Sequence, residues 1–337
     1  MPSLTIKQLK GKASIQDLGR NNAQHMGFSG SGAADEFSFL LANHLIGNSL
    51  TKDKKTRNNI STAAFEVTLG QLSLVANNTC KLVITGADCQ SYIRQKNGET
   101  LMVKNNQTFE LSQGDEICLG IPKHQLHSYI AIEGGFSTKT YLNSASQTVN
   151  EYALELGEAE LKVGKQLHYP AHTSNNSLSN EVLAKKNLCN NFHQSEQLCL
   201  RFLPNPVWLQ LTSNSQQFFL NQLYQITSQS NRMGYRLLGD PLRIKSASQA
   251  LSKPINYGTI QLPDDGQPIV LMKERQTIGG YPTLGTVIQT DLFRLSQKRP
   301  GEKISFIPAT LEQAQAQLLA FYGKFILNKN QITSEHN

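Results

Sequence analysis

Cysteine is scarce in this chain of 337 residues, and the few cysteines form no framework. None belongs to a C-x-x-C pair and their number is odd, which argues against a disulfide scaffold and against a zinc site. The histidines lack H-x-x-x-H spacing, so no metal site is predicted. Three cysteines (80, 118 and 199) stand among apolar residues, as core cysteines do. The five cysteines are Cys80, Cys89, Cys118, Cys189 and Cys199.

Long apolar runs are also missing. Hydrophobic residues make up 39% and the mean hydropathy is −0.36. No run approaches the roughly 18 apolar residues of a membrane span. Residues 1–12 contain lysines but no apolar signal-peptide core. We therefore expect a cytoplasmic protein that does not enter a membrane.

Two kinds of catalytic motif are absent as well. The glycines near residue 30 do not have G-x-G-x-x-G spacing, and no P-loop Gly-Lys-Ser/Thr exists, so no nucleotide fingerprint is present. Neither a G-x-S-x-G elbow nor a Ser-His-Asp arrangement is visible, so covalent serine catalysis is not indicated.

Acidic residues are outnumbered, which leaves a net charge of +7. Much of the excess lies in Lys52, Lys54, Lys55 and Arg57. No aromatic residue interleaves with these charges, so they indicate a solvated loop, and no nucleic-acid partner is expected. A positive surface would still favour anionic substrates or acidic partners.

Most of the chain is predicted to be strand, which places it in the mainly β class. Residues 65–76 alternate between apolar and polar, and 91–103 predict a hairpin turning at Asn97-Gly98. Helices are expected at Ala34–Ile46, at Leu311–Phe325 behind a Thr310/Gln313 capping box, and as a short piece at Gln216–Tyr224. Leu311, Ala314, Leu318 and Phe321 would form the apolar stripe of the last long helix.

A polar, Asn/Ser-rich stretch divides the chain. We interpret residues 171–195 as a linker or surface excursion, with a short helix near 181–186. It separates an N-terminal β domain, 1–170, from a C-terminal β domain, 196–337, that ends in a helix.

The segment Lys273–Pro282 is the most informative candidate for a site. A strand-like run leads into Arg275 and Gln276, then the pair Gly279-Gly280, then Tyr281. The glycines let backbone N–H groups approach a ligand, and the guanidinium offers a planar fork for a carboxylate or phosphate. The alternative is a surface hairpin with a solvated arginine.

The loop Gly27–Asp35 opens directly into the first predicted helix. Free N–H groups at a helix N-terminus suit a carboxylate, bicarbonate or phosphate, which makes Gly30, Ser31 and Gly32 candidates. The alternative is that Ser31 or Asp35 only caps the helix. His25 precedes the glycines and could shuttle protons or be a structural histidine.

Three further polar groups are candidates. Glu66, between Phe65 and Val67, would face water or a cleft and could orient a substrate amide or act as a base. In an extended segment, Arg232 and Arg236 would share one face and bind a carboxylate or acyl-phosphate, unless they pair with acidic neighbours. The amides of Gln267 and Gln276 could read the edge of a lactam or urea-like group.

These segments, in this order and spacing, resemble a known family: allophanate hydrolase subunit 2, also described as a biotin-dependent carboxyltransferase domain. It includes the C subunits of 5-oxoprolinases and KipA-type regulators. The similarity runs from about Ser14 to about Leu319. Its motifs are Gln16–Arg20 followed by His25, Gly27, Gly32, Ala33 and Asp35, then Phe65–Gly70, then Ser228–Leu237 with Gly258–Pro263 and Asp265–Pro268, and finally Lys273–Pro282. It implies two β-barrel domains of the cyclophilin-like kind, with which many short strands agree.

The resemblance also implies a site, which we expect to gather in one cleft. The catalytic residues would be His25, Asp35, Glu66 and Arg275. The substrate-binding residues would be Arg20, Gly30, Ser31, Gly32, Arg232, Tyr235, Arg236, Gln267, Gln276, Gly279, Gly280 and Tyr281.

The function implied is that of an enzyme subunit, inactive alone. It would act with a B-like partner, of the allophanate hydrolase subunit 1 or KipI kind, and with a LamB/YcsF-like A-type protein in ATP-dependent opening of 5-oxoproline to glutamate. ATP would be a co-substrate held by the complex, and the substrate a small anion or amide.

One alternative is a carboxyltransferase acting on a urea-like amide with carboxybiotin; no Met-Lys-Met motif is present, so biotin would be carried by another protein. Another is a KipA-like regulator that neutralises a kinase inhibitor.

The chain departs from the family pattern in four places. Asn205 replaces a glycine between two prolines, and Asn143-Ser144-Ala145 replaces Gly-Ser-Arg. A glycine-rich stretch is lost at 151–156, and Glu274 stands where aspartate is common. The missing arginine at 145 would remove an anion contact, so these changes bear on catalysis more than on the fold.

Overall fold

The computed structural model describes residues 1–20, 22–48, 63–148, 160–171, 192, 197–243 and 252–333, with side chains up to 325. It consists of two compact units. The N-terminal unit comprises Met1–Arg20, Ser31–Asn190 and Lys324–Asn337, and the C-terminal unit comprises Asn21–Gly30 and Asn191–Gly323. The basic segment 52–57, the predicted helix at 181–186, most of the predicted linker and the departure at 151–156 lie outside the described residues.

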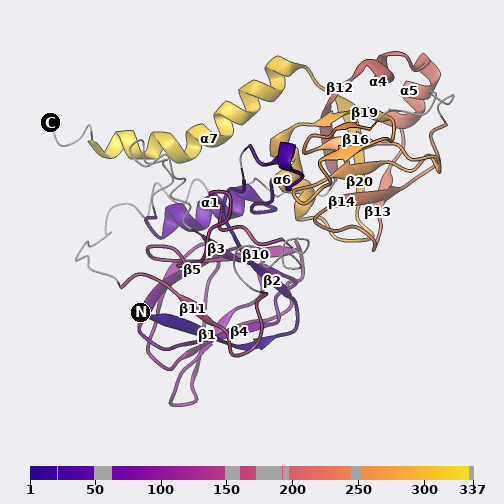
Figure 1. The fold of residues 1–337 in the computed structure, drawn as a ribbon. Helices are drawn as coiled ribbons and strands as arrows, with labels where there is room; N and C mark the ends of the chain where they lie inside the picture. Colours follow the sequence, from indigo (N-terminus) through magenta and orange to yellow (C-terminus); the bar gives the residue numbers. More distant parts are fainter. Residues whose placement is uncertain are drawn as a thin grey trace. The chain divides into compact units, whose positions relative to one another are not determined.

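The N-terminal unit is built from two antiparallel sheets (Figure 1). One has the order β11-β1-β4-β9-β6-β7 and the other the order β2-β3-β10-β5-β8. The strands are β1 (Ser3–Leu9), β2 (Lys12–Gln16), β3 (Ala64–Thr68), β4 (Leu72–Ala76), β5 (Cys80–Gly86), β6 (Tyr92–Arg94), β7 (Thr100–Met102), β8 (Thr108–Leu111), β9 (Glu116–Leu119), β10 (His127–Ile132) and β11 (Gln166–His168).

Both sheets contribute side chains to one hydrophobic core. Phe65 and Val67 of β3 and Leu72 and Leu74 of β4 are buried there, as their alternation predicts. The predicted hairpin is confirmed, because β6 pairs with β7 across the turn that contains Asn97-Gly98. Helix α1 (Glu36–Leu45) packs against β5 and β10 within this unit.

The C-terminal unit is a closed barrel of order β12-β19-β16-β17-β14-β13-β20 (Figure 1). Strands β12 and β20 are parallel, and the other described barrel pairs are antiparallel. The separate ribbon β15–β18 lies outside the barrel order. The strands are β12 (Leu198–Pro204), β13 (Tyr224–Ile226), β14 (Gly234–Leu238), β15 (Lys253–Pro254), β16 (Thr259–Gln261), β17 (Ile269–Leu271), β18 (Ile278–Gly279), β19 (Thr283–Val287) and β20 (Lys303–Pro308).

Aromatic rings fill one part of the barrel core. Phe219 lies 4.9 Å from Phe306 and 5.4 Å from Trp208, measured between ring centroids. Trp208 belongs to α4 (Pro206–Leu209), a single turn that Asn205 caps by accepting a hydrogen bond from the Trp208 N–H. The Asn205 amide also donates to Thr283 O and Oγ1. The departure from glycine at this position therefore fastens α4 to β19.

The mainly β class is confirmed, and so are the three predicted helices, with shifted ends. Besides α1, they are α5 (Ser213–Leu220) and α7 (Leu311–Thr333). The capping box forms, since the N–H groups of Thr310 and Gln313 each donate to the other's side chain. The predicted stripe on α7 is wrong at its start. Phe321 is 3% exposed but Leu311 is 56% exposed, because the first turns of α7 have few neighbours.

The described ranges contain three helical elements that were not predicted: η1 (Gln24–Met26), α4 (Pro206–Leu209) and α6 (Gln289–Ser296). The two units do not follow the predicted domain boundaries at 170 and 196 everywhere. Two short segments belong to the other unit than predicted, Asn21–Gly30 and Lys324–Asn337. The end of α7 belongs with the N-terminal unit, because Phe325 makes edge contacts with Phe37 and His44 of α1. Residues 21–30 belong with the C-terminal unit. None of the helices in the described ranges combines the length and apolar character of a membrane span.

Candidate functional site

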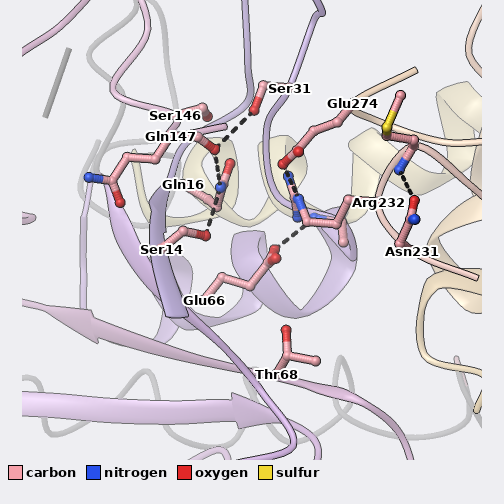
Figure 2. A network of polar contacts seen from close by, with 12 residues as sticks. Ser14, Gln16, Ser31, Glu66, Thr68, Ser146, Gln147, Asn231, Arg232 and Glu274 are labelled. Carbon is pink, nitrogen blue, oxygen red and sulfur yellow. Dashed lines mark hydrogen bonds and ion pairs between the residues drawn. The ribbon is translucent and has the colours of Figure 1, made fainter. Parts of the chain in front are cut away.

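Glu66 lies on β3 and is the centre of a buried hydrogen-bond network in the N-terminal unit. Phe65 and Val67 face the core, so Glu66 points to the opposite side, toward the start of α1. Its Oε2 accepts hydrogen bonds from Ala34 N at 2.8 Å and from the Tyr129 hydroxyl at 2.7 Å. Figure 2 shows Glu66 beside Thr68 of the same strand. The side chain is only 2% exposed, so of the two predicted alternatives, water or a cleft, the structure excludes open water.

Tyr129 of β10 keeps its proton in this network. Burial, and then the negative charge of Glu66, raise the pKa of Tyr129 well above its usual range. The neutral phenol can therefore donate to Glu66 and at the same time accept from Asp35 N at 2.8 Å. His127 is the neighbouring group, with Nδ1 at 3.8 Å from Glu66 Oε1 and 3.1 Å from Thr68 Oγ1.

Asp35 caps α1. Its Oδ1 accepts from Phe37 N at 3.1 Å and Ser38 N at 3.3 Å, and its Oδ2 accepts from Ser38 Oγ at 2.5 Å. The sequence left capping and catalysis open as alternatives, and this geometry is that of a cap. Asp35 and Glu66 meet at the helix start, where Tyr129 bonds to both residues. Their carboxylates hold the end of the helix.

Arg20 and Ser31 come together through the segment 144–147. The Arg20 Nη2 donates to Ser146 O at 2.6 Å, and Ser31 Oγ lies 3.5 Å from Gln147 O. Gln16 Nε2 donates to the same Gln147 carbonyl at 2.9 Å (Figure 2). Ser31 and Gly32 both have positive φ, 51° and 101°. A Cβ at Gly32 would lie 3.0 Å from Gly19 N, so a glycine is needed there.

Asp17 holds the segment 144–147 in place through hydrogen bonds. Its carboxylate accepts from Gly19 N, Ser144 Oγ and Ala145 N, each at 2.7 Å, and from Ser146 Oγ at 2.5 Å. The Ala145 side chain is buried in the core of the unit. An arginine at this position would have to leave the core, so the departure from the family pattern agrees with the local packing.

In the C-terminal unit, Arg232 is paired. Its Nε donates to Glu274 Oε1, and Arg232 O accepts from Glu274 N at 2.8 Å (Figure 2). The alternative of an arginine bound to an acidic neighbour is therefore realised at Arg232. The prediction that Arg232 and Arg236 share one face of an extended segment is wrong. Strand β14 starts only at Gly234, and Arg232 lies in the turn before it. Arg236 itself is exposed.

Two predicted binding residues are engaged within the barrel. The hydroxyl of Tyr235 is buried and donates to Ser296 O at 2.9 Å. The Gln267 amide matches a peptide group: Gly239 N donates to Oε1 at 2.9 Å and Nε2 donates to Gly239 O at 3.0 Å. Gln267 therefore pairs with a peptide group of the protein's own backbone, and its predicted contact with a lactam or urea-like group stays a prediction. His25, in η1, and Gln276, Gly280 and Tyr281 are exposed.

Arg275 is a buried cation of this unit. It is 6% exposed, and its Nε donates to Ile255 O at 3.2 Å. Burial lowers the pKa of Arg275, and Tyr257 partly opposes that change. Within the described ranges no carboxylate pairs with Arg275. The alternative of a solvated surface arginine is therefore wrong.

Sequence reasoning missed Asp17, Tyr129 and Tyr257 in these clusters, and it also missed Gln261, whose side chain is buried in the C-terminal unit. Asp17 and Gln261 lie inside family motifs, which was the available signal. Over the described ranges, no three His, Cys, Asp or Glu side chains gather as a metal site would need. A cavity of about 240 Å³ in the N-terminal unit, lined by Ile15, Phe136–Thr138 and Lys165–His168, contains none of the predicted site residues. The single cleft joining residues of both units stays a prediction.

The comparisons with known proteins agree with the motifs. A family described as carboxyltransferase domain, subdomain A and B, matches residues 26–308. The chain is 32% identical to the C subunit of 5-oxoprolinase from Escherichia coli (strain K12) over 300 residues, 89% of either protein. It is 25% identical to urea amidolyase of Saccharomyces cerevisiae over 318 residues, covering 90% of this chain but 16% of that protein.

A likeness to a solved structure concerns the fold. The Kluyveromyces lactis urea carboxylase superposes with a TM-score of 0.82 at 21% identity, over 96% of this chain and 29% of that one. The match covers most of the chain and agrees with the order of the motifs and with the closed barrel. The chain therefore belongs to the family of carboxyltransferase domains with subdomains A and B.

Proposed function

We propose that this chain is one subunit of an ATP-dependent 5-oxoprolinase-type amidohydrolase, which opens 5-oxoproline to glutamate. The observation that carries the proposal is the extent of the match with the 5-oxoprolinase C subunits. The Escherichia coli protein is matched over 89% of its length and the Haemophilus influenzae protein over 93%. By contrast, the match covers 16% of the urea amidolyase of Saccharomyces cerevisiae. The higher identity to the C subunits, over most of their length, therefore favours a role like theirs.

The chemistry of ring opening defines what the subunit must provide. ATP transfers a phosphoryl group to the lactam carbonyl oxygen, and ADP leaves. One water adds to the activated carbon as the C–N bond breaks, and a second water releases the phosphate to give glutamate. An oxyanion or carboxylate in such a reaction needs buried donors. Arg275 fits that requirement, because it is a buried guanidinium with no carboxylate against it among the described residues.

The other proposed catalytic carboxylates are better suited to positioning. Glu66 and Asp35 each accept several hydrogen bonds at the start of α1. A carboxylate whose oxygen atoms already accept several hydrogen bonds has few lone pairs left to take a proton from a substrate. We assign them to holding the Gly30–Gly32 loop and the helix start in place, and we assign anion binding to Arg275.

The donors found here suit an anionic oxygen, but no nucleotide-binding loop accompanies them in the sequence. We therefore infer that ATP is bound by the complex, with a B-like partner and a LamB/YcsF-like A-type protein, and that this chain alone is inactive. Co-expression with the B-like partner followed by size-exclusion chromatography tests the pairing. Separate elution of the two proteins at micromolar concentration would contradict it.

The assay that tests the function uses the reconstituted complex. ATP hydrolysis and glutamate formation are measured with 5-oxoproline, with urea and without substrate, and again with each protein omitted in turn. We expect ATP hydrolysis coupled to glutamate only when 5-oxoproline and all the proteins are present. Turnover by this chain alone, or coupling to urea instead of 5-oxoproline, would refute the proposal.

A second candidate is favoured by the family description and the likeness to urea amidolyase. In it, the chain transfers a carboxyl group from carboxybiotin, carried by another protein, to a urea-like amide. Transfer of labelled carboxylate from a biotin carrier to urea, in the presence of this chain, would support this candidate. If no labelled carboxylate is transferred to urea while ATP hydrolysis depends on 5-oxoproline, the carboxyltransferase candidate is excluded.

A further inference from the structure

The ring of Tyr257 lies between two buried cations in the C-terminal unit. Lys273 Nζ is 4.8 Å and Arg275 Cζ is 5.9 Å from the ring centroid. The exposed fractions of these two residues are 7% and 6%. Such cation–π contacts stabilise a buried cation only in part.

The hydrogen bonds of Arg275 leave its positive charge uncompensated. Its Nε donates to Ile255 O, and its Nη1 lies 3.5 Å from Met272 O. Both acceptors are neutral carbonyls, and no ion pair to Arg275 exists in the part of the chain that the structure describes. A buried charge is expensive unless an opposite charge accompanies it. The arrangement calls for an anion that is not part of these residues.

Gln261, at the end of β16, supplies an independent sign of a missing ligand. It is 1% exposed, and its Nε2 has no hydrogen-bond partner among the described residues. A buried amide donor without an acceptor is uncommon in folded proteins. An oxygen atom supplied by a bound ligand would satisfy this donor.

Ile255 and Gly279 connect the two groups. A Cβ added to Gly279 would lie 2.8 Å from Gln261 Nε2 and would overlap the Ile255 side chain. The carbonyl of the same Ile255 accepts from Arg275. The ribbon β15–β18 carries Gly279 past Ile255, whose N–H bonds to Thr277 O at 3.0 Å. The glycine therefore leaves room for the Gln261 amide next to the side chain of Ile255, the residue whose carbonyl binds Arg275.

We propose that Arg275 and Gln261, next to Tyr257, form a binding site for the carboxylate of a small organic acid. Both side chains can only donate at their nitrogen atoms, so the partner must be an acceptor, and the cation selects a negative one. The proposal rests on the proposed function, in which this carboxylate is that of 5-oxoproline. The neighbouring lactam would then be left free for attack. Urea carries no carboxylate and would not use the site.

In a purely structural role, Arg275 would connect the backbone at Ile255 to the backbone at Met272. That role explains its two hydrogen bonds to carbonyl oxygens. It does not explain the unpartnered amide of Gln261. The two readings differ in what Gln261→Leu does. In a ligand site, leucine removes an unsatisfied donor, so the free protein gains thermal stability while ligand binding is lost. In a plain core, the same substitution has no effect on any ligand.

The test is a calorimetric titration of the full chain, and of the reconstituted complex, with three probes. They are 5-oxoproline, its analogue without the carboxylate (2-pyrrolidinone), and cyclopentanecarboxylate, which lacks the lactam. We expect both carboxylates to bind and 2-pyrrolidinone not to bind. Gln261→Leu should weaken carboxylate binding about tenfold while raising the melting temperature of the free protein.

Gln222→Leu is the matched control, since the Gln222 amide is paired with the backbone of Asp240. It should lower stability slightly and leave carboxylate binding unchanged. The proposal is overturned if 2-pyrrolidinone binds as well as 5-oxoproline, if no carboxylate binds the chain or the complex, or if Gln261→Leu leaves the affinity as it was. Carboxylate binding in a complex that turns over urea but not 5-oxoproline would keep this site and reject only the proposed function.

Discussion

The hydroxyl of Tyr129 and the carboxylate of Glu66 are joined by a hydrogen bond of 2.7 Å that links two neighbouring strands to one helix. Tyr129 and Glu66 face each other across β10 and β3, and both bond to the backbone at the start of α1. The pair therefore sets the position of the Gly30–Gly32 loop, which leads into that helix.

Replacing Tyr129 by phenylalanine should destabilise the N-terminal unit. The change removes a donor to a buried carboxylate and an acceptor for Asp35 N, so we expect a loss of about 2–4 kcal/mol in the free energy of unfolding. Urea denaturation measures it. Tyr92→Phe is the control, because the Tyr92 hydroxyl accepts an exposed bond from Arg94 at the surface. Equal losses in the two variants would contradict a special role for the Glu66 network.

Asp17→Asn should loosen the segment 144–147. An asparagine keeps the shape but turns one oxygen into a donor, which then faces the donors that Asp17 now accepts. We expect about 2–3 kcal/mol of destabilisation and faster amide exchange at Ala145. Asp88→Asn, where the carboxylate makes an exposed bond to Gln90 N, should change stability by less than about 0.5 kcal/mol.

Gly70→Ala should be far more damaging than Gly98→Ala. Both glycines have positive φ, 64° and 89°, so each substitution carries a similar backbone strain of about 1–2 kcal/mol. At Gly98 the added Cβ meets open space, whereas at Gly70 it would overlap the Gly120 carbonyl. We expect on the order of 3 kcal/mol or more for Gly70→Ala, with loss of soluble protein. A similar melting temperature for both variants would show that the Gly120 strand end yields easily.

The thiol of Cys80 should make stability depend on alkaline pH. Burial raises the pKa of Cys80 from 9.0 to about 11, with Tyr169 lowering it and Glu110 raising it. Because the pKa in the folded state is the higher one, the stabilising contribution is complete below pH 9 and is lost as the pH rises through 11. The stability difference between the native protein and Cys80→Ala should therefore shrink between pH 8 and pH 11, on the order of 1–2 kcal/mol. A constant difference would contradict the shift.

Arg275→Lys should reduce turnover of the reconstituted complex on the order of a hundredfold, because an ammonium cannot reproduce the planar fork. Since Arg275 also bonds to Ile255 O, a small drop in melting temperature should accompany it. Arg201→Lys separates the two effects: Arg201 forms a two-pronged pair with Asp291, so that variant should lose stability but keep turnover. Normal turnover in Arg275→Lys would remove Arg275 from the site.

Features encoded locally were predictable from the sequence. The turn at Asn97-Gly98 and the Thr310/Gln313 capping box each depend on residues a few positions apart, so the pattern contains the whole interaction. Helix α6 was not predicted because its N-cap, Ile288, makes no side-chain cap and gives no start signal. The family motifs identified Asp35 and Glu66, but not that their partners are backbone N–H groups and Tyr129.

Long-range pairings explain most of the remaining differences. Arg232 and Glu274 are 42 positions apart and meet only because β14 pairs with β17. Gln267 meets Gly239 in the same way. The buried Gln261 amide depends on the close passage of Gly279, which nothing in the composition of either segment indicates.

The parallel pairing of β12 with β20 makes the C-terminal barrel slow to assemble during synthesis. β12 ends at Pro204, and its two neighbours, β19 and β20, begin only at Thr283 and Lys303. Until those residues leave the ribosome, the apolar side chains of Leu198, Leu200 and Phe202 have no strand on either side. Long loops must close before this barrel gains any of its core, which favours slow folding and exposure to aggregation. A nascent chain that stalls before Pro308 would carry an open barrel edge.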